Sequence, residues 1–183
     1  MGATVHAIKD IEKIKDMEDY LSKKDIRYGM MWKLGINVGI RISDIVKLKV
    51  KDYQDHKFTI IEQKTKKMKT FNVPNWFQPE LEAYINRHKY RSDYLFPNKQ
   101  TKKHISRVRA WQVITEAAKH CEIDNVGTHS MRKTFGYWYY KKTFDIASLM
   151  RLFNHSSEQV TLLYIEAMDR RLQESISTFD VFK

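Results

Sequence analysis

Apolar side chains recur at intervals of three and four residues along most of the chain, the spacing that places them on one face of an α-helix. The first such stretch is residues 8–23, where the apolar positions are Ile8, Ile11, Ile14, Met17 and Leu21. A second apolar segment covers residues 30–38, and further helices are predicted over residues 79–89, 108–121, 129–142, 146–152, 158–168 and 170–177. The pattern therefore predicts a mainly helical protein.

One region has the residue preferences of β-strands instead. Residues 57–63 and 70–73 are rich in β-branched and aromatic side chains, and they flank a lysine-filled connection at residues 64–69. We expect an antiparallel hairpin that carries positive charge at its tip. Since no repeat, low-complexity tract or interdomain linker interrupts the chain, the expected fold class is mainly α with a small antiparallel β-sheet (α+β), in one domain.

The composition excludes several classes of protein. No stretch approaches the roughly 20 apolar residues of a membrane span, and residues 1–9 lack the apolar core of a secretory signal, so we expect a cytoplasmic protein without a membrane partner. The single cysteine, Cys121, excludes a disulfide framework and a multi-cysteine metal site. The glycines form no phosphate-binding loop, and no HExxH motif occurs. Neither a cofactor nor a metal is expected.

The charge of the chain points to a polyanionic partner. The 183 residues include 33 Lys and Arg against 22 Asp and Glu, which gives a net charge of +11. The excess lies in the middle, where residues 87–109 hold eight basic residues against the single acid Asp93, and residues 49–70 hold seven lysines against three acids. Such runs can be merely solvated, but two dense runs favour a phosphate-binding surface. The candidate DNA-contacting residues are Lys66, Lys67, Lys102, Lys103, Arg107 and Arg109.

Several short motifs, in a fixed order, resemble those of the tyrosine recombinase (phage integrase) family. They are GIRISDI at residues 39–45, QKT at 63–65, THSMRKT at 128–134, LFNHSS at 152–157 and LYI at 163–165. Each motif is weak alone, but their order and separations together are specific, and the resemblance covers residues 8 to about 175. It implies the catalytic-domain fold of DNA breaking-rejoining enzymes and a site-specific DNA recombinase that works through a covalent 3′-phosphotyrosine intermediate.

The resemblance also implies a role for each matching residue. Tyr164 is the nucleophile, Arg41 and Arg132 hold the scissile phosphate, Lys64 is the hairpin lysine, and His129 and His155 complete the pocket. The chemistry is reasonable on its own terms, because attack of a phenol on a phosphodiester builds negative charge that two guanidinium groups stabilise. A phosphotyrosine conserves the energy of the broken bond, so religation needs no ATP. Lys64 would protonate the leaving 5′ oxygen, His129 would exchange a proton with the tyrosine, and His155 would hydrogen-bond the phosphate.

Some assignments have alternatives. Lys66 is the main rival of Lys64, because the two strands of the hairpin cannot be registered from sequence. Arg41 could pair with Asp44, three residues later, although we favour Asp44 as a residue that orients the guanidinium toward DNA. Ser43 and Asp44 are also suited to start a short helix.

The chain departs from the family pattern at two positions. Asn154 stands where a glycine usually precedes the second histidine, and Lys133 stands where His or Arg usually follows the second arginine. Neither change removes a reactive group. The aromatic cluster after Arg132 is expected to pack in the core rather than to stack on bases, and its members are Phe135, Tyr137, Trp138, Tyr139 and Tyr140.

The resemblance implies partners and a domain organisation as well. We expect one catalytic domain over residues 1–183, with a core at 8–164 and no N-terminal core-binding domain, either as an excised fragment or as a small single-domain recombinase. The C-terminal tail at 165–183 is expected to dock on its own domain without DNA and on a neighbour when DNA is bound. The expected partner is double-stranded DNA, bound by a homotetramer that is a monomer when free, and an accessory DNA-bending protein could assist. Integration, excision and inversion stay open. The alternatives in function are a non-catalytic DNA-binding regulator on the same fold and a type IB topoisomerase-like enzyme.

Overall fold

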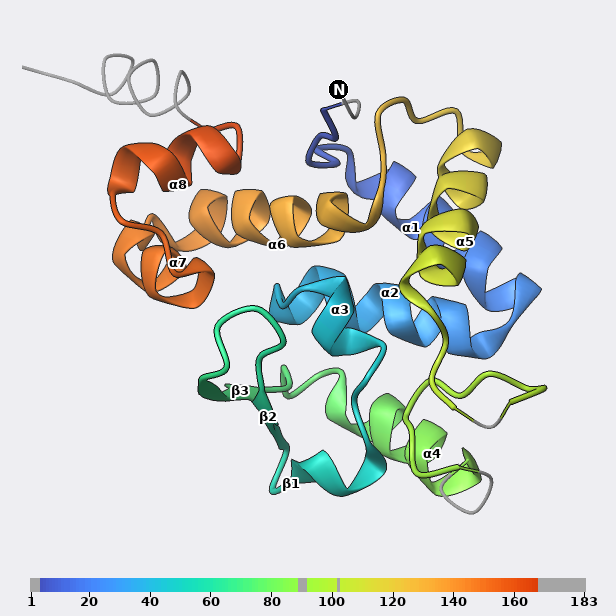
Figure 1. Ribbon diagram of the computed structural model, residues 1–183. Helices are drawn as coiled ribbons and strands as arrows, with labels where there is room; N and C mark the ends of the chain where they lie inside the picture. The colour runs from blue at the N-terminus through green and yellow to red at the C-terminus, as the bar shows by residue number, and fades with distance from the viewer. Residues whose placement is uncertain (1–3, 89–91, 102, 168–183) are drawn as a thin grey trace, which may run out of the picture.

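The computed structural model describes residues 4–88, 92–101 and 103–167, and its helices surround one small sheet (Figure 1). The elements in chain order are α1 (Ile11–Lys24), α2 (Ile26–Val38), α3 (Ile42–Ile45), the 3₁₀ helix η1 (Val50–Asp52), β1 (Tyr53–Gln54), β2 (Lys57–Ile61), β3 (Met68–Asn72), α4 (Gln78–His88), α5 (Arg107–His120), α6 (Thr128–Thr143), α7 (Ile146–Phe153) and α8 (Glu158–Tyr164). The predicted fold class, mainly helical with a small antiparallel sheet, is confirmed.

The first helices are set by polar caps and a glycine. The Asp10 side chain accepts hydrogen bonds from the N–H groups of Glu12 and Lys13 at the start of α1. Asp25 ends α1 and also caps α2, so the chain reverses there without a loop. Gly39 ends α2 in the left-handed conformation, with φ of 64°, which a residue with a side chain rarely adopts. This turn directs the chain after Gly39, including Arg41, toward the face that carries the candidate active site.

Two hydrophobic cores hold the molecule together. The larger core is built around α2, whose Trp32 and Leu34 are completely buried, and takes side chains from α1, α4, α5 and the sheet. The smaller core joins the second half of α6 to α7 and α8, through residues such as Tyr140, Leu149 and Leu162. In Figure 1, α6 runs from the larger core toward the α7–α8 pair. The α7–α8 pair therefore has a small core of its own.

The sheet contains the predicted hairpin and one further strand. β2 pairs antiparallel with β3 in a register that places Phe58 opposite Phe71 and Ile61 opposite Met68. The chain reverses over residues 62–67, so the lysine-rich connection predicted at residues 64–69 begins and ends two residues earlier than expected. β1 adds a third antiparallel strand beside β2. The sequence pattern did not reveal β1, because a strand of two residues has no periodicity.

Several predicted boundaries were wrong. The short helix begins at Ile42 with Arg41 as its N-cap, so Ser43 and Asp44 lie inside it rather than starting it. The last described helix ends at Tyr164 instead of residue 168, because Glu166 adopts the left-handed conformation with φ of 59°. α1 begins at Ile11, three residues later than expected. The helix predicted over residues 170–177 lies outside the described residues.

The aromatic cluster that follows Arg132 was predicted to pack in the core. Tyr137 and Tyr140 are buried, and Phe135, Trp138 and Tyr139 are partly buried, so the prediction is confirmed. Among the residues that the structure describes, no helix is long and apolar enough to span a bilayer.

Candidate active site

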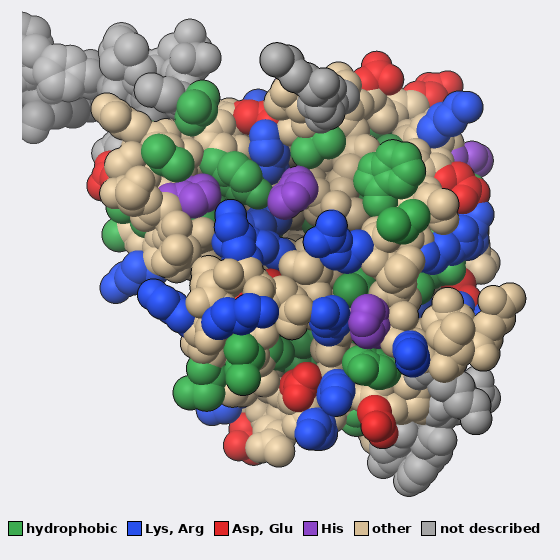
Figure 2. Space-filling model, in the orientation of Figure 1, with side chains coloured by type: hydrophobic (Ala, Val, Ile, Leu, Met, Phe, Trp, Pro, Cys, Tyr) green, Lys and Arg blue, Asp and Glu red, His purple; other side chains and the backbone are tan. Residues whose placement is uncertain are grey.

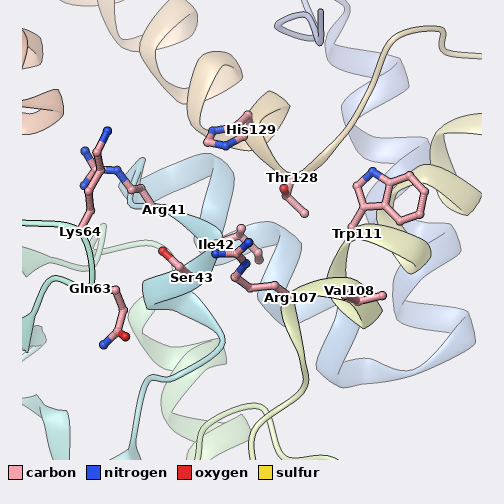
Figure 3. Close-up of a pocket in the computed structure, with 10 residues that line it drawn as sticks. All are labelled: Arg41, Ile42, Ser43, Gln63, Lys64, Arg107, Val108, Trp111, Thr128 and His129. Carbon is pink, nitrogen blue, oxygen red and sulfur yellow. The ribbon is translucent and has the colours of Figure 1, made fainter. Parts of the chain in front are cut away.

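Basic side chains and histidines gather around a hollow in the face shown in Figure 2. A pocket of about 610 Å³ opens between α3, the hairpin, α5 and the start of α6, and Figure 3 shows the side chains that line it. The lining residues are Arg41, Ile42, Ser43, Gln63, Lys64, Arg107, Val108, Trp111, Thr128 and His129. Three of the predicted catalytic residues, Arg41, Lys64 and His129, therefore share one cavity.

Arg41 is positioned by a carboxylate of the hairpin rather than by its neighbour in sequence. Its Nη1 donates to Oε1 of the buried Glu62, at 3.0 Å. The predicted role of Asp44 as its orienting partner was wrong, because the Asp44 carboxylate instead accepts the backbone N–H of Gln63 at 2.8 Å. Glu62 and Asp44 together fasten the hairpin to α3. A pair that is 21 residues apart in the chain thus holds the guanidinium at the edge of the pocket.

Arg132 lies deeper, one turn after the start of α6, with only 3% of its surface exposed. Its Nη1 donates to the Gly39 carbonyl at 2.6 Å, and its Cζ lies 4.3 Å from the centroid of the Phe153 ring. Burial lowers the pKa of Arg132 to about 10, although the nearby Tyr164 and two carboxylates oppose that shift. The group stays positively charged at neutral pH. Arg41 and Arg132 lie close enough to act electrostatically on one another and on Tyr164.

His129 lies in the first turn of α6, three residues before Arg132 and on the same side of the helix. Its imidazole lines the pocket together with Arg41 and Lys64 (Figure 3). Burial, followed by the positive charges of Arg132 and Arg41, lowers the pKa of His129 below its ordinary value. The ring is therefore neutral at physiological pH, which is the state that can accept a proton.

Tyr164 and His155 are brought together by the turn between α7 and α8. Asn154 makes this turn in the left-handed conformation, with φ of 56°, where Asn is the best tolerated residue after Gly. This explains why Asn can replace the glycine of the family pattern. The rings of His155 and Tyr164 then lie edge to face with centroids 5.1 Å apart. The predicted nine-residue separation does place the imidazole beside the phenol.

The hydrogen bonds around Thr161 fix the state of His155. The Thr161 hydroxyl donates to the Ser157 carbonyl at 3.0 Å, so its oxygen accepts from Nδ1–H of His155 at 3.1 Å. Burial and the charges of Arg132 and Arg41 lower the pKa of His155. In the neutral ring, Nε2 then carries no hydrogen.

The phenol of Tyr164 is protonated in the free protein. Burial raises the pKa of Tyr164 above its ordinary value, although Arg132 and Arg41 oppose the shift. Its ring also packs edge-on against Phe153, with centroids 5.4 Å apart. The phenol therefore needs a base before it can act as a nucleophile.

The hairpin presents its lysines in different ways. Lys64 lines the pocket, and its side chain extends alongside that of Arg41 in Figure 3. Both lysines are exposed, but Lys66, its rival, has φ of 58° and is not among the lining residues. The geometry favours Lys64 as the hairpin lysine of the site.

Sequence reasoning missed Lys69. Its Nζ lies 3.6 Å from Oε1 of Glu62 and donates to the Leu152 carbonyl at 2.5 Å, and burial lowers its pKa. Strand periodicity could have found it, since Lys69 lies two residues before the buried Phe71 and therefore on the same face of β3. Lys69 adds a third positive charge close to Arg41 and Arg132.

The remaining basic candidates differ in their surroundings. Arg107 lines the pocket, one turn of α5 before Trp111, whose side chain is 52% exposed and was also missed. Lys67 and Lys103 are exposed. Arg109 instead donates from Nε to the Tyr28 hydroxyl at 3.1 Å. Lys102 lies outside the described residues.

The arrangement suits phosphoryl transfer, because positioning and charge stabilisation of a phosphodiester require a nucleophile, guanidinium groups and imidazoles. Arg41, Lys64 and His129 line the cavity, whereas Arg132, His155 and Tyr164 are not among its lining residues. Among the residues that the structure describes, no group of three or more His, Cys, Asp or Glu side chains is placed to hold a metal ion.

Comparisons with known proteins agree with this arrangement. A model described as the phage integrase family matches residues 7–171. The chain is 42% identical over 163 residues to the probable integrase/recombinase YoeC of Bacillus subtilis, which is 88% of this chain and 89% of that protein. It is 25% identical over 169 residues to the tyrosine recombinase XerA of Pyrococcus furiosus, of which it spans 59%.

Solved structures show the same fold. A crystal structure of XerA recombinase matches with a TM-score of 0.78 at 18% identity, over 97% of this chain and 65% of that one. The post-cleavage complex of the XerH site-specific recombinase with difH substrate matches at 0.73 and 18%, over 97% and 54%. A lambda integrase tetramer bound to a Holliday junction matches at 0.72 and 12%, over 90% and 49%. At these identities, the likeness establishes the fold alone.

Proposed function

This chain belongs to the phage integrase family of tyrosine recombinases, and from that premise we propose that it is a site-specific recombinase that cleaves and rejoins DNA through a covalent 3′-phosphotyrosine. One observation carries the proposal. The partly buried phenol of Tyr164 lies beside His155 and within the electrostatic reach of both Arg132 and Arg41. A tyrosine that merely filled a core would not need two arginines beside its hydroxyl.

In the proposed cleavage step, the scissile phosphate sits between Arg41 and Arg132. The Tyr164 oxygen attacks phosphorus while its proton passes to the neutral imidazole of His129. A phosphorus–oxygen bond to Tyr164 forms, and the bond from phosphorus to the 5′ oxygen breaks. Charge that develops on the non-bridging oxygens is stabilised by the guanidinium groups, which are already in place before the substrate binds.

The leaving group and the second histidine complete the step. Lys64 donates a proton to the departing 5′ oxygen, which leaves as a hydroxyl. The negative phosphate favours the protonated form of His155, so that Nε2–H of His155 donates to a phosphate oxygen. Religation runs the same steps in reverse with a 5′ hydroxyl from the partner strand, and no nucleotide cofactor is consumed.

The substrate and assembly belong to the same proposal. The basic residues around the pocket fit the backbone of double-stranded DNA. Strand exchange needs paired sites, and the resemblance to a recombinase tetramer on a Holliday junction supports a homotetramer on DNA. We expect a monomer when the protein is free, and an accessory DNA-bending protein could assist. The chain spans 49–65% of the three solved chains described above, so the activity of a whole protein is itself part of the proposal.

Covalent trapping tests the proposal. A library of randomised duplexes, each with a nick close to the 3′ side of the variable position, is incubated with the protein and then denatured in SDS. Cleavage beside a nick releases a short strand that diffuses away, so the 3′-phosphotyrosine accumulates. We expect an SDS-resistant adduct whose DNA phosphate maps to the peptide that contains Tyr164.

The matched variant is Tyr164→Phe, which keeps the ring and removes the nucleophile. It should bind the selected duplexes as the wild type does and form no adduct. An adduct on another residue, an adduct formed by the Phe variant, or no adduct from any library duplex would overturn the proposal.

A further inference from the structure

The helix that carries Tyr164 ends in a turn made by an unusual residue. The N–H of Ala167 donates to the Leu162 carbonyl at 3.0 Å, and the N–H of Glu166 donates to the Leu163 carbonyl at 3.2 Å. This pair of bonds is the Schellman motif, whose left-handed position is usually glycine. Here that position is Glu166, with φ of 59°. A side chain is kept at a place where its Cβ is unfavourable.

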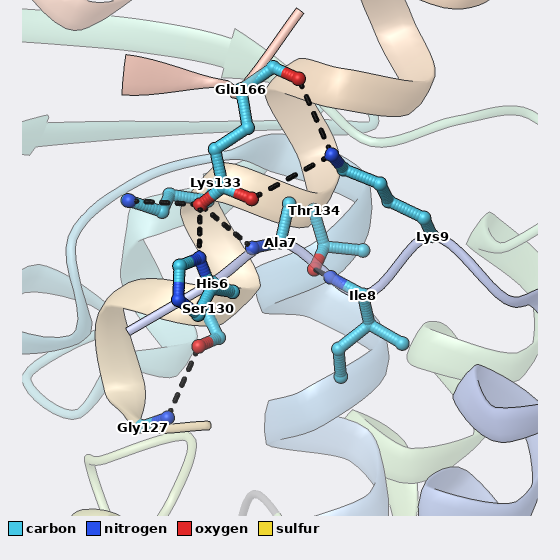
Figure 4. A network of polar contacts seen from close by, with 9 residues as sticks. All are labelled: His6, Ala7, Ile8, Lys9, Gly127, Ser130, Lys133, Thr134 and Glu166. Atoms are coloured by element: carbon cyan, nitrogen blue, oxygen red, sulfur yellow. Dashed lines mark hydrogen bonds and ion pairs between the residues drawn. The ribbon is translucent and has the colours of Figure 1, made fainter. Parts of the chain in front are cut away.

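The Glu166 carboxylate is held from two directions (Figure 4). Lys133 of α6 donates from Nζ to Oε1 of Glu166 at 3.1 Å. From the N-terminal segment, His6 donates to the same oxygen at 3.1 Å, and the N–H of Ala7 donates to it at 3.4 Å. Lys9 donates from Nζ to the Glu166 carbonyl at 3.3 Å. Although burial alone would raise the pKa of Glu166, Lys133 and His6 hold it below its ordinary value, so the group is ionised.

The segment that grips Glu166 is itself anchored. The Ile8 N–H donates to Oγ1 of Thr134 at 2.9 Å, and the Ile8 carbonyl accepts from Nε1 of Trp138 at 3.0 Å. The His6 N–H donates to the Asn125 carbonyl at 2.8 Å. The segment from His6 to Lys9 is therefore fixed on α6, which also carries Arg132.

Lys133 contacts both Glu166 and the ring of Tyr164. It follows Arg132 in the chain, and its Nζ lies 5.5 Å from the centroid of the Tyr164 ring as well as 3.1 Å from Glu166. The side chains of Lys133 and Glu166 are 13% and 21% exposed, so their ion pair is partly shielded from water. Lys133, which departs from the family pattern, is thus paired with the carboxylate of Glu166, two residues after the nucleophile Tyr164.

We infer that Glu166 is a positioning residue for Tyr164. Its contacts with Lys133 and with the segment from His6 to Lys9 fix the end of α8 so that the phenol faces Arg132. The inference rests on the proposed function, because it assigns Glu166 to the nucleophile of that reaction. It also gives the first residues of the described chain a part in the site.

The chain contains a matched control for a purely structural role. α5 ends in the same motif, with Ile123 N–H bonded to the Ala118 carbonyl at 2.9 Å and Glu122 N–H to the Lys119 carbonyl at 3.2 Å. Glu122 holds the left-handed position there with φ of 55°, and its side chain is exposed. If Glu166 were only a helix cap, replacing either glutamate by glycine would have the same effect, and glycine would relieve the backbone at both places.

The experiment compares Glu166→Gly with Glu122→Gly in the full chain, with single-turnover cleavage and DNA affinity measured separately. We expect Glu166→Gly to bind DNA as the wild type does and to cleave at least about tenfold more slowly, since misplacing the nucleophile costs rate rather than affinity. Glu122→Gly should match the wild type in both. Glu166→Gln, which keeps the shape and loses the charge, should lie between the two. Wild-type cleavage by Glu166→Gly would overturn the inference.

A second measurement does not depend on cleavage. Tyrosines are replaced biosynthetically by 3-fluorotyrosine, and the ¹⁹F signal of Tyr164 is assigned as the one that Tyr164→Phe removes. In the free protein, Glu166→Gly should shift or broaden this signal and Glu122→Gly should leave it unchanged. An unchanged signal in Glu166→Gly would sink the inference, even if the wild type cleaved DNA. If the wild type cleaved nothing, the proposed function would fail while this measurement still decided the place of Glu166.

Discussion

The guanidinium of Arg132 lies against the ring of Phe153, with its Cζ 4.3 Å from the ring centroid. Together with the 2.6 Å hydrogen bond from Nη1 to the Gly39 carbonyl, this contact fixes the plane of the fork. A fork held in this way stabilises developing charge without having to reorganise. Gly39 also ends α2 and leads directly to Arg41, so one turn places both arginines.

Replacing either arginine by lysine should therefore abolish most cleavage. Arg41→Lys and Arg132→Lys each keep a positive charge but lose the paired donors, and we expect the cleavage rate to fall by about a hundredfold to a thousandfold. Single-turnover trapping on the selected duplex measures the effect. Arg151→Lys, at an exposed arginine of α7, is the matched control and should cleave normally. Near-normal cleavage by either test variant would remove that arginine from the site.

The parts of the site that the sequence predicted are those within one local element. His129 and Arg132 share a helix face, and His155 and Tyr164 are joined by one turn and one helix, so periodicity was enough to place each pair. The partner of Arg41 was not predictable in this way. Glu62 reaches Arg41 only because the hairpin connection and the start of α3 meet in space, and the sequence favoured the nearer Asp44.

Contacts between distant segments were missed for the same reason. The pairing register of β2 and β3, which turns Lys69 inward, depends on packing against the core. His6 and Glu166 are 160 residues apart, and no local pattern signals their contact. The fold class could be predicted because helix and strand periodicity are local properties of the chain.

Lys64 can be tested as the proton donor by changing the leaving group. Lys64→Ala should lower cleavage of an ordinary duplex by about a hundredfold to ten-thousandfold. A duplex with sulfur in place of the bridging 5′ oxygen should restore the rate, because a thiolate leaves without a proton. Lys66→Ala is the matched control on the same hairpin and, with DNA at saturation, should cleave both duplexes normally. If sulfur failed to rescue Lys64→Ala, the lysine would act in binding and another group would be the acid.

The rate of cleavage should hold at lower pH than an ordinary histidine base would allow. Burial and the positive charges of Arg132 and Arg41 hold the pKa of His129 below its ordinary value, so the imidazole is protonated only at lower pH than an ordinary histidine. We expect the midpoint at which the cleavage rate declines to be displaced toward lower pH in the same way. The rate is measured with DNA below saturation, so that it reports the free protein.

His129→Gln and His155→Gln separate the two imidazoles. The pKa of His155 is also below its ordinary value. Both imidazoles are therefore protonated as the pH falls, and the wild-type pH profile does not by itself tell them apart. His155→Gln should slow cleavage and keep the midpoint of the pH profile, whereas His129→Gln should slow cleavage and remove it. A wild-type midpoint at or above that of an ordinary imidazole would contradict the assigned base.

The DNA surface around the pocket should show itself in the salt dependence of binding. Arg107 lines the pocket at the start of α5, and Lys103 is exposed just before it. Each phosphate contact releases condensed counterions, so losing one contact should lower the slope of log K against log salt concentration by about 0.9. Arg107→Gln and Lys103→Gln should each weaken binding to all duplexes alike, because phosphate contacts carry no sequence information.

Lys23→Gln on α1 removes an exposed charge that does not line this pocket, and it should leave the slope unchanged. Equal slopes for all three variants and the wild type would mean that the charge of this region is only solvated surface, and that DNA meets the protein elsewhere.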